Sequence, residues 1–493
     1  MRAFFRCALI AWFFSTLGGF TSADEKPEDP LVRVTDLAVG EEAVVKLHDG
    51  VTATVKLLKL KEERDPIRDA VRISEVTVAV NGEEAVLKTG MYNLPRTVGG
   101  VQIDCSITKG YNSNGTPEFW GLDKDARLRL WPAGSPLLPP GALIYPVKQR
   151  WFASATWFDN EPIDGGAAIE KKIYYHSGID IGATEGMTEV VAATDALVVS
   201  SGLQILDEHK IDTPAKIRYD VVYLLDRRGW YYRYSHMQSI DPAIVPGRVI
   251  KQGDRIGVVG KEGASGGWSH LHFEIVCRQP SGKWGTQASY ALLREAYLRQ
   301  YETPLIACVR ARYFITPGES VTHDGSKSSS VSGAIDRFEW KFTDGTTASG
   351  PTVTRSYPKP GVYSEVLKVT DRDGHVDYDF AIVHVLDPAK PGKYSPNLHV
   401  NYAPSLGVKA GQKMTFKVRA FNTSEGEETW DFGDGTPAVR TRSDGDGPKL
   451  NPDGYAIVEH VYKDAGVYLV RVARQSDDGT PAFDHVDVFV DAP

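Results

Sequence analysis

Four histidines and one aspartate in the middle of the chain have the residue types and spacing of a metal-dependent hydrolase. His176 and Asp180 are four residues apart, His270 and His272 are two apart, and His236 lies between the two pairs. Zinc binds imidazole nitrogen and carboxylate oxygen in tetrahedral sites, and a catalytic site keeps its fourth position for water. An imidazole that is not a ligand can transfer protons. These residues therefore predict a hydrolytic zinc centre.

The segment around the last pair predicts a strand that carries both histidines on one face. Side chains alternate along a strand, so His270 and His272 point to the same side, and Leu271 and Phe273 point to the packed side. One imidazole of the pair suits zinc ligation and the other acid–base work. A tight Ser-Gly turn separates His176 from Asp180, so a loop or strand end can bring both to one ion.

Each motif alone is weak. An isolated HxH is more often an ordinary strand pair than a metal site, and an isolated HxxxD is weaker still. The order HxxxD, Tyr-Ser-His and HxH, with a Gly-rich turn at 260–267 directly before the last motif, is far more specific.

Together these motifs resemble the lysostaphin/LytM-type zinc endopeptidases, a peptidoglycan hydrolase family with a duplicated hybrid motif fold. The resemblance covers roughly 142–280. It rests on four segments of this sequence, which are His176-Ser177-Gly178-Ile179-Asp180, Tyr234-Ser235-His236, the glycine-containing run 249–260 (VIKQGDRIGVVG), and His270-Leu271-His272-Phe273-Glu274.

The resemblance implies a role for each residue of the motifs. His176, Asp180 and His272 would hold one zinc ion, and His236 and His270 would assist catalysis. Which of these two histidines takes the proton and which stabilises the oxyanion or protonates the leaving amine is left open by their spacing.

Two departures from the family pattern concern substrate choice. A longer polar segment, 203–218, replaces a short hairpin and contains His209. We expect a surface loop there, and the alternative is a groove wall that tunes specificity. Asp226-Arg227-Arg228-Gly229 stands where the family usually has H-x-x-G.

The chain is predicted to be mainly β and multidomain, with an antiparallel β-sheet peptidase domain and two immunoglobulin-like β-sandwiches. The repeated Trp-x-Phe-x-Asp-Gly turns at 340–345 and 430–435, and the Gly-Val-Tyr elements at 361–363 and 466–468, resemble PKD domains. Apolar spacing over 287–300 predicts one helix that closes the peptidase domain. The expected divisions are a signal peptide (1–23), a β-rich domain of unknown type (24–140), the peptidase domain (141–303), PKD-like domains (304–388 and 398–493) and a linker (389–397).

Export is indicated by the N-terminus, where two arginines precede a short apolar run and small residues that suit cleavage. We expect a periplasmic, cell-envelope or secreted protein without a membrane span after cleavage. Cys105, Cys277 and Cys308 have no CxxC spacing, so they suit one disulfide with a spare thiol or three buried thiols. The formal net charge of -8 gives no support for a nucleic-acid partner.

The sequence thus favours an exported zinc metalloendopeptidase that hydrolyses cross-links or stem peptides of bacterial peptidoglycan. The PKD-like pair is expected to contact wall polysaccharide or protein, or to act as a spacer. Alternatives are a zinc-retaining wall-binding or hydrolase-activating protein without turnover, an adhesion protein, and a protease for Gly-rich proteins. The domain at 24–140 could also hold the enzyme latent by covering its groove.

Overall fold

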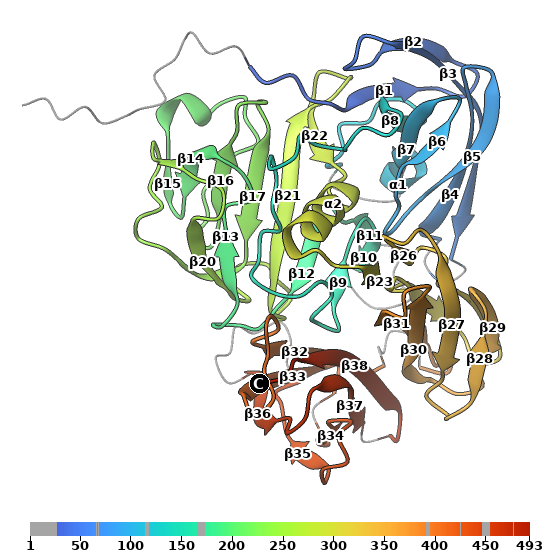
Figure 1. The fold of residues 1–493 in the computed structure, drawn as a ribbon, viewed down its shortest axis with the longest axis vertical. Coiled ribbons are helices and arrows are strands. Elements are labelled where there is room, and N and C mark those ends of the chain that lie inside the picture. Colours follow the sequence, from blue (N-terminus) through green and yellow to red (C-terminus); the bar gives the residue numbers. More distant parts are fainter. Residues whose placement is uncertain are drawn as a thin grey trace, which may run out of the picture.

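The chain folds mainly into antiparallel β-sheets (Figure 1), as its short alternating segments predicted. The computed structural model describes residues 27–493 apart from 66, 68, 114–117, 165–172, 391–394, 424, 446–453 and 477. In this part of the chain the α-helices are α1 (Gly110–Ser113) and α2 (Tyr290–Tyr301), and a 3-10 turn covers Asp207–His209. The predicted signal peptide lies outside the described residues.

The N-terminal part consists of two four-stranded sheets that enclose a core of alternating Val, Leu and Ile side chains. The first has the order β1-β8-β7-β6 and the second the order β2-β3-β4-β5. Their strands are β1 (Arg33–Leu37), β2 (Glu42–Lys46), β3 (Thr52–Arg64), β4 (Val71–Val80), β5 (Glu83–Thr89), β6 (Arg96–Val98), β7 (Val101–Thr108) and β8 (Ala126–Pro132).

The middle of the chain is built around one long sheet with the order β15-β14-β16-β17-β21-β12-β9, to which β19 and β22 add. A smaller sheet has the order β13-β20-β18, and β10 pairs with β11. The strands are β9 (Trp157–Phe158), β10 (Pro162–Asp164), β11 (Ile173–Tyr175), β12 (Ile179–Gly182), β13 (Glu189–Val191), β14 (Ala196–Ser201), β15 (Gln204–Ile205), β16 (Val222–Leu225), β17 (Tyr231–Ser235), β18 (Met237–Ile240), β19 (Val249–Ile250), β20 (Arg255–Val259), β21 (His270–Arg278) and β22 (Trp284–Gln287).

Burial of one face fixes the register of β21, because a slip by one residue would turn its histidines into the core. Leu271, Phe273 and Ile275 are fully buried in the main hydrophobic core. Helix α2 packs on the same core through six buried residues, among them Leu293 and Tyr297. It overlaps the segment 287–300, whose apolar spacing predicted a helix, and ends one residue beyond it.

The C-terminal strands form two β-sandwiches that share a continuous sheet of order β24-β31-β30-β38-β37-β34-β35. A parallel pairing of Val362 with Ala482 joins them. The strands are β23 (Leu305–Ile306), β24 (Arg312–Ile315), β25 (Ser320–Asp324), β26 (Ser329–Ser330), β27 (Ile335–Lys341), β28 (Thr347–Ser349), β29 (Thr352–Ser356), β30 (Gly361–Asp371), β31 (Val376–Val385), β32 (Asn397–Ala403), β33 (Lys413–Phe421), β34 (Glu428–Asp431), β35 (Val439–Thr441), β36 (Ala456–Val461), β37 (Gly466–Gln475) and β38 (Pro481–Val490).

The last sandwich packs directly against the middle domain, with β32 lying beneath β9 and β12 in Figure 1. Ser154 forms a β-bridge with Asn401 of β32, and the Ala155 amide donates to the Val400 carbonyl at 2.9 Å. Ala153 and Ala155 belong to the same hydrophobic core as that sandwich. The two units therefore share backbone pairing and a core.

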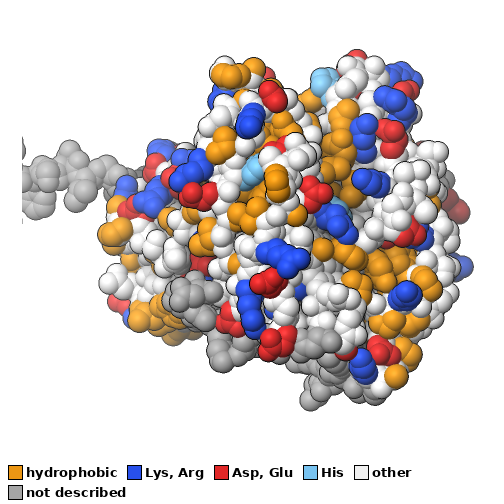
Figure 2. Space-filling view, turned by 90° about the horizontal axis from the view of Figure 1, so that it is seen from below, with side chains coloured by type: hydrophobic (Ala, Val, Ile, Leu, Met, Phe, Trp, Pro, Cys, Tyr) orange, Lys and Arg blue, Asp and Glu red, His pale blue; other side chains and the backbone are white. Residues whose placement is uncertain are grey.

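Cys105, Cys277 and Cys308 are buried free thiols, which decides between the two alternatives that the sequence left open. Burial raises the pKa of Cys277 and of Cys308 to about 12, so both thiols are protonated at neutral pH. Among the described residues, no helix combines the length and apolar character needed to cross a bilayer. Seen from below, basic and acidic side chains are interspersed with hydrophobic ones (Figure 2).

Candidate metal centre and active site

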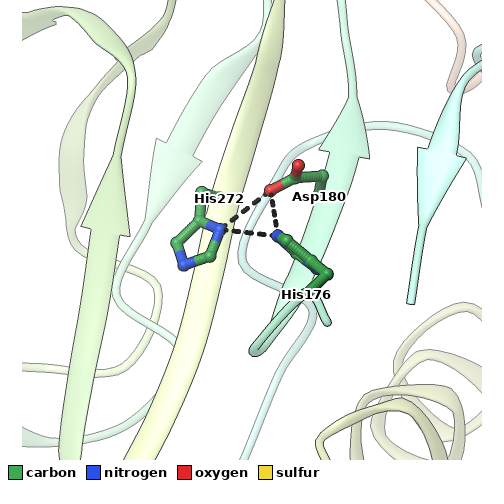
Figure 3. A group of neighbouring side chains, drawn as sticks. All are labelled: His176, Asp180 and His272. Atoms are coloured by element: carbon green, nitrogen blue, oxygen red, sulfur yellow. Dashed lines mark hydrogen bonds and ion pairs between the residues drawn. The ribbon is translucent and has the colours of Figure 1, made fainter. Parts of the chain in front are cut away.

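His176, Asp180 and His272 converge on one point although 96 residues separate the first from the last. Nε2 of His176 lies 3.1 Å from Oδ1 of Asp180 and 3.1 Å from Nδ1 of His272, and Oδ1 lies 2.8 Å from that Nδ1. Figure 3 shows the three groups pointing toward one another from β12, its preceding turn and β21. The antiparallel register places Asp180 opposite His272.

The turn at Ser177-Gly178 brings His176 back over the strand that carries Asp180. Gly178 has φ 76°, a left-handed conformation that glycine adopts at little cost. A Cβ at this position would lie 2.6 Å from the carbonyl oxygen of Phe273 and 2.9 Å from Cβ of Glu274. The glycine of the HxxxD motif is therefore required by both conformation and space.

The charges of the three groups suit a bound cation. Burial opposes ionisation of Asp180, but the imidazoles of His176 and His270 hold its pKa well below the ordinary value. Burial likewise opposes protonation of His176, and the Asp180 carboxylate outweighs it and raises the pKa of His176. Two nitrogens and one carboxylate oxygen that lie 2.8 to 3.1 Å apart match the donor set and spacing of a tetrahedral zinc site. These residues would bind the ion through Nε2 of His176, Oδ1 of Asp180 and Nδ1 of His272.

A buried carboxylate, that of Glu274, lies next to His272 on the side of the ring opposite Nδ1. Nε2 of His272 lies 3.6 Å from Oε2 of Glu274, which lies 3.4 Å from Nη1 of Arg233. Burial raises the pKa of Glu274, but His272 and Arg233 outweigh it and bring that pKa to about 2. An ionised Glu274 favours the tautomer of His272 that carries its proton on Nε2 and leaves Nδ1 free for a metal.

His236 and His270 lie beside the three converging residues, with their ring centroids 4.6 Å apart. Nδ1 of His236 donates to the Glu262 carbonyl at 2.7 Å, and Nδ1 of His270 donates to the Trp268 carbonyl at 3.0 Å. Each bond leaves Nε2 as the nitrogen that can accept a proton. Nε2 of His270 lies 3.5 Å from Oδ2 of Asp180.

Both histidines are neutral at pH 7. Burial lowers the pKa of His270 to about 4, and burial together with the neighbouring imidazole of His270 lowers the pKa of His236 well below its ordinary value. All five predicted residues are at most 6% exposed. The arrangement can therefore hold a divalent cation next to two neutral imidazoles.

Several residues around His236 had no motif that could reveal them. The His236 amide donates to Oδ2 of Asp220 at 2.9 Å, and Arg218 forms an ion pair with the same carboxylate. Nη2 of Arg218 also lies 3.3 Å from Nδ1 of His236. The expected surface loop 203–218 is largely exposed or half-buried, but its last residue reaches the site. His209 instead contacts the hydroxyl of Tyr231 at 2.8 Å.

A second group of possible metal donors lies in a turn of the first C-terminal sandwich. Asp371, Asp373 and His375 bring one donor atom each within 4.8 Å of one another, but Asp373 and His375 are exposed. The Asp371 carboxylate already accepts the amides of Asp373 and His375. These contacts are those of an ordinary Asx turn.

Family models match three consecutive segments of the chain. Residues 174–283 match peptidase family M23, and residues 301–385 and 397–481 match PKD domains. Collagenase ColA of Clostridium perfringens is 28% identical over 81 residues, which are 16% of this chain and 7% of that enzyme's length.

Solved structures overlap with this chain only in part. Helicobacter pylori Csd3 is 18% identical and covers 44% of this chain and 49% of its own, with a TM-score of 0.20. The fibronectin(III)-like modules of Clostridium thermocellum CbhA are 16% identical and cover 38% of this chain and 93% of their own, with a TM-score of 0.15. The chain contains a peptidase family M23 domain followed by two PKD domains, the architecture that its motifs predicted.

Proposed function

We propose that this protein is an exported zinc metalloendopeptidase that hydrolyses peptide bonds of bacterial peptidoglycan, in cross-links or stem peptides. One observation carries the proposal. Nε2 of His176, Oδ1 of Asp180 and Nδ1 of His272 lie 2.8 to 3.1 Å from one another, beside two neutral imidazoles. The M23 match supports peptide-bond hydrolysis by the same segment.

The residues divide into holding and proton-handling groups. A zinc ion held by His176, Asp180 and His272 would acidify a water molecule and polarise the scissile carbonyl. His236 and His270 both present Nε2 to the site in the neutral form, so each can accept a proton or donate a hydrogen bond once protonated. Glu262 and Trp268 fix the tautomers of these imidazoles through their backbone carbonyls.

The peptidoglycan target rests on the family resemblance and on the export signal read from the sequence. The PKD pair would add contacts to wall polysaccharide or protein. A groove of about 670 Å³ lies between the two sandwiches, and it is lined by Lys341, Asp344, Tyr378, Asp431 and Arg471 among others. Its lining offers hydrogen-bond donors such as Lys341 and acceptors such as Asp344, which would suit the hydroxyl groups of a glycan.

The test compares wild type with His272→Ala, using His209→Ala as a control histidine outside the site. Zinc content is measured by mass spectrometry, and fragments released from purified peptidoglycan of differing cross-link chemistry are identified by mass. We expect one zinc ion and defined peptide cuts for wild type and His209→Ala, and loss of both for His272→Ala. Equal wall-lytic activity in all three would exclude the zinc mechanism.

The same experiment separates the alternative functions. Bound zinc without released fragments would favour a wall-binding or hydrolase-activating protein. Cleavage of Gly-Gly peptides without release of wall fragments would favour a protease for Gly-rich proteins.

A further inference from the structure

One loop, 261–269, orients both proton-handling histidines. It joins β20 to β21, and its carbonyls at Glu262 and Trp268 accept the Nδ1 protons of His236 and His270. The indole of Trp268 also stacks on the ring of His270, with centroids 3.8 Å apart and planes 17° apart. The positions of the two imidazoles therefore depend on where this loop is held.

The loop has little rigidity of its own. Gly263, Gly266 and Gly267 have φ between 61° and 83°, and glycine is the residue with the greatest backbone freedom. Within the loop, the hydroxyl of Ser265 donates to the Lys261 carbonyl and accepts the Gly267 amide at 3.1 Å. Trp268 itself is only half-buried. Contacts from outside the loop must therefore hold the end that leads into β21.

Part of this support comes from the peptidase domain itself, where the Ser269 hydroxyl donates to the Ala183 carbonyl at 2.7 Å and the ring of Phe158 lies 5.2 Å from that of Trp268. The second PKD domain adds contacts at three consecutive residues. Nη1 of Arg419 donates to the Gly267 carbonyl at 2.5 Å, and the Ser269 amide donates to the hydroxyl of Tyr455 at 2.7 Å. Between them, the ring of His399 stacks on Trp268 with centroids 5.1 Å apart and planes 28° apart.

The domain also fixes the beginning of the loop. Nζ of Lys417 donates to the Glu185 carbonyl at 2.8 Å, and the Glu185 carboxylate forms a buried ion pair with Lys261. His399 is in turn held by a hydrogen bond of 2.7 Å between its Nδ1 and Oγ1 of Thr156, and by the edge of Phe421. The stack is thus anchored on both domains.

We propose that the second PKD domain helps to position the catalytic histidines of the active site. In this proposal His399 is a positioning residue that acts on His270 through Trp268. This inference rests on the proposed function, because it assigns a role in the same hydrolytic site. His399 lies behind Trp268 and touches neither the zinc donors nor His270 among the contacts of the described residues. Its loss should misplace an imidazole and leave the donor set intact.

The central experiment uses the full zinc-loaded chain and purified dye-labelled peptidoglycan. It compares wild type with His399→Ala, which removes the stacked ring, and His399→Phe, which keeps a ring without the hydrogen bond. We expect His399→Ala to lower kcat between about 10-fold and 100-fold, the range for a displaced catalytic group. KM and zinc stoichiometry should stay near wild-type values, and His399→Phe should recover most of kcat.

A matched control is His384→Ala in the first PKD domain. His384 is also 7% exposed and stacks on an aromatic ring, Phe314, with centroids 4.6 Å apart. It should lower the melting temperature as His399→Ala does while leaving kcat unchanged. An unchanged kcat in His399→Ala, or an equal loss in both variants, would overturn the inference.

A second readout does not depend on turnover. The Nδ1–H proton resonances of His236 and His270 report their bonds to the loop carbonyls. They should shift or broaden in His399→Ala and stay in place in His384→Ala. If zinc-loaded wild type cleaves no wall substrate, the proposed function fails, and the resonances still decide the positioning role. Unchanged resonances in His399→Ala would overturn it.

Discussion

The backbone amide of His236 donates to Oδ2 of Asp220 at 2.9 Å, in a histidine whose φ is 67°. A left-handed backbone is costly for a side chain with a Cβ, and such conformations persist at functional sites where surrounding contacts over-determine them. Arg218 fixes the Asp220 carboxylate in turn. The orientation of His236 is therefore set at both its backbone and its ring.

This relationship predicts that Asp220→Ala lowers kcat without loss of zinc. With no carboxylate to accept the amide, His236 should relax toward an ordinary backbone conformation, and kcat should fall by about 10-fold to 100-fold. Steady-state kinetics and metal analysis on the same sample provide the measurement. Asp220→Asn keeps one acceptor oxygen and should retain more activity. A variant with full activity and full helical and strand content would refute this role for Asp220.

Gly178→Ala should disrupt the metal centre more than an ordinary glycine substitution does. Its Cβ would meet the Phe273 carbonyl at 2.6 Å in a backbone with φ 76°. The control is Gly229→Ala, which has φ 78° and open space around the added Cβ. Gly229→Ala should cost about 1 kcal/mol in free energy of unfolding through conformation alone. Gly178→Ala should cost more and also weaken zinc binding, as measured by thermal unfolding and zinc titration.

The sequence could predict that these residues come together because local geometry brings them close, while their assignment as zinc ligands came from the family resemblance. Strand alternation places His270 and His272 on one face, and the turn at Gly178 returns His176 toward Asp180. The mainly β fold and the PKD pair were also predicted, and the family matches and sheets confirm them. Each of these features is encoded by a short motif of neighbouring residues.

The remaining parts of the site have no such signal. Glu262 and Trp268 act through backbone carbonyls, which every residue type possesses, so no side-chain pattern marks them. The stack of Trp268 on His399 joins residues from different domains, and its formation depends on how the domains dock. The repeated PKD motifs likewise gave no indication that Val362 and Ala482 join both sandwiches in one sheet.

Glu274→Gln should weaken zinc binding without removing a ligand. The buried carboxylate holds a negative charge beside Nε2 of His272, and loss of a supporting carboxylate typically costs 10-fold to 100-fold in metal affinity. We expect a loss of about that size in competition titrations with a chromophoric chelator. Arg233→Met tests whether the carboxylate acts alone, because it removes the partner of Glu274 and leaves the charge near His272. An unchanged zinc affinity in Glu274→Gln would argue against this support.

The free energy of unfolding of the PKD pair should fall as the pH rises, because Asp484 loses its proton on unfolding. Burial raises the pKa of this carboxyl from 3.8 to about 8, even though Arg310 and Arg312 favour ionisation. Between pH 3.8 and about pH 8 the folded chain holds a proton that the unfolded chain has released, so the free energy of unfolding falls by up to about 1.4 kcal/mol for each pH unit.

Asp484→Asn removes this titration and keeps an oxygen to accept the His485 amide. Its melting temperature relative to wild type should therefore increase from pH 5 to pH 8. Asp491→Asn, at an exposed carboxylate of the same domain, controls for the loss of one negative charge. Parallel pH curves for wild type and Asp484→Asn would show that Asp484 is not the titrating group.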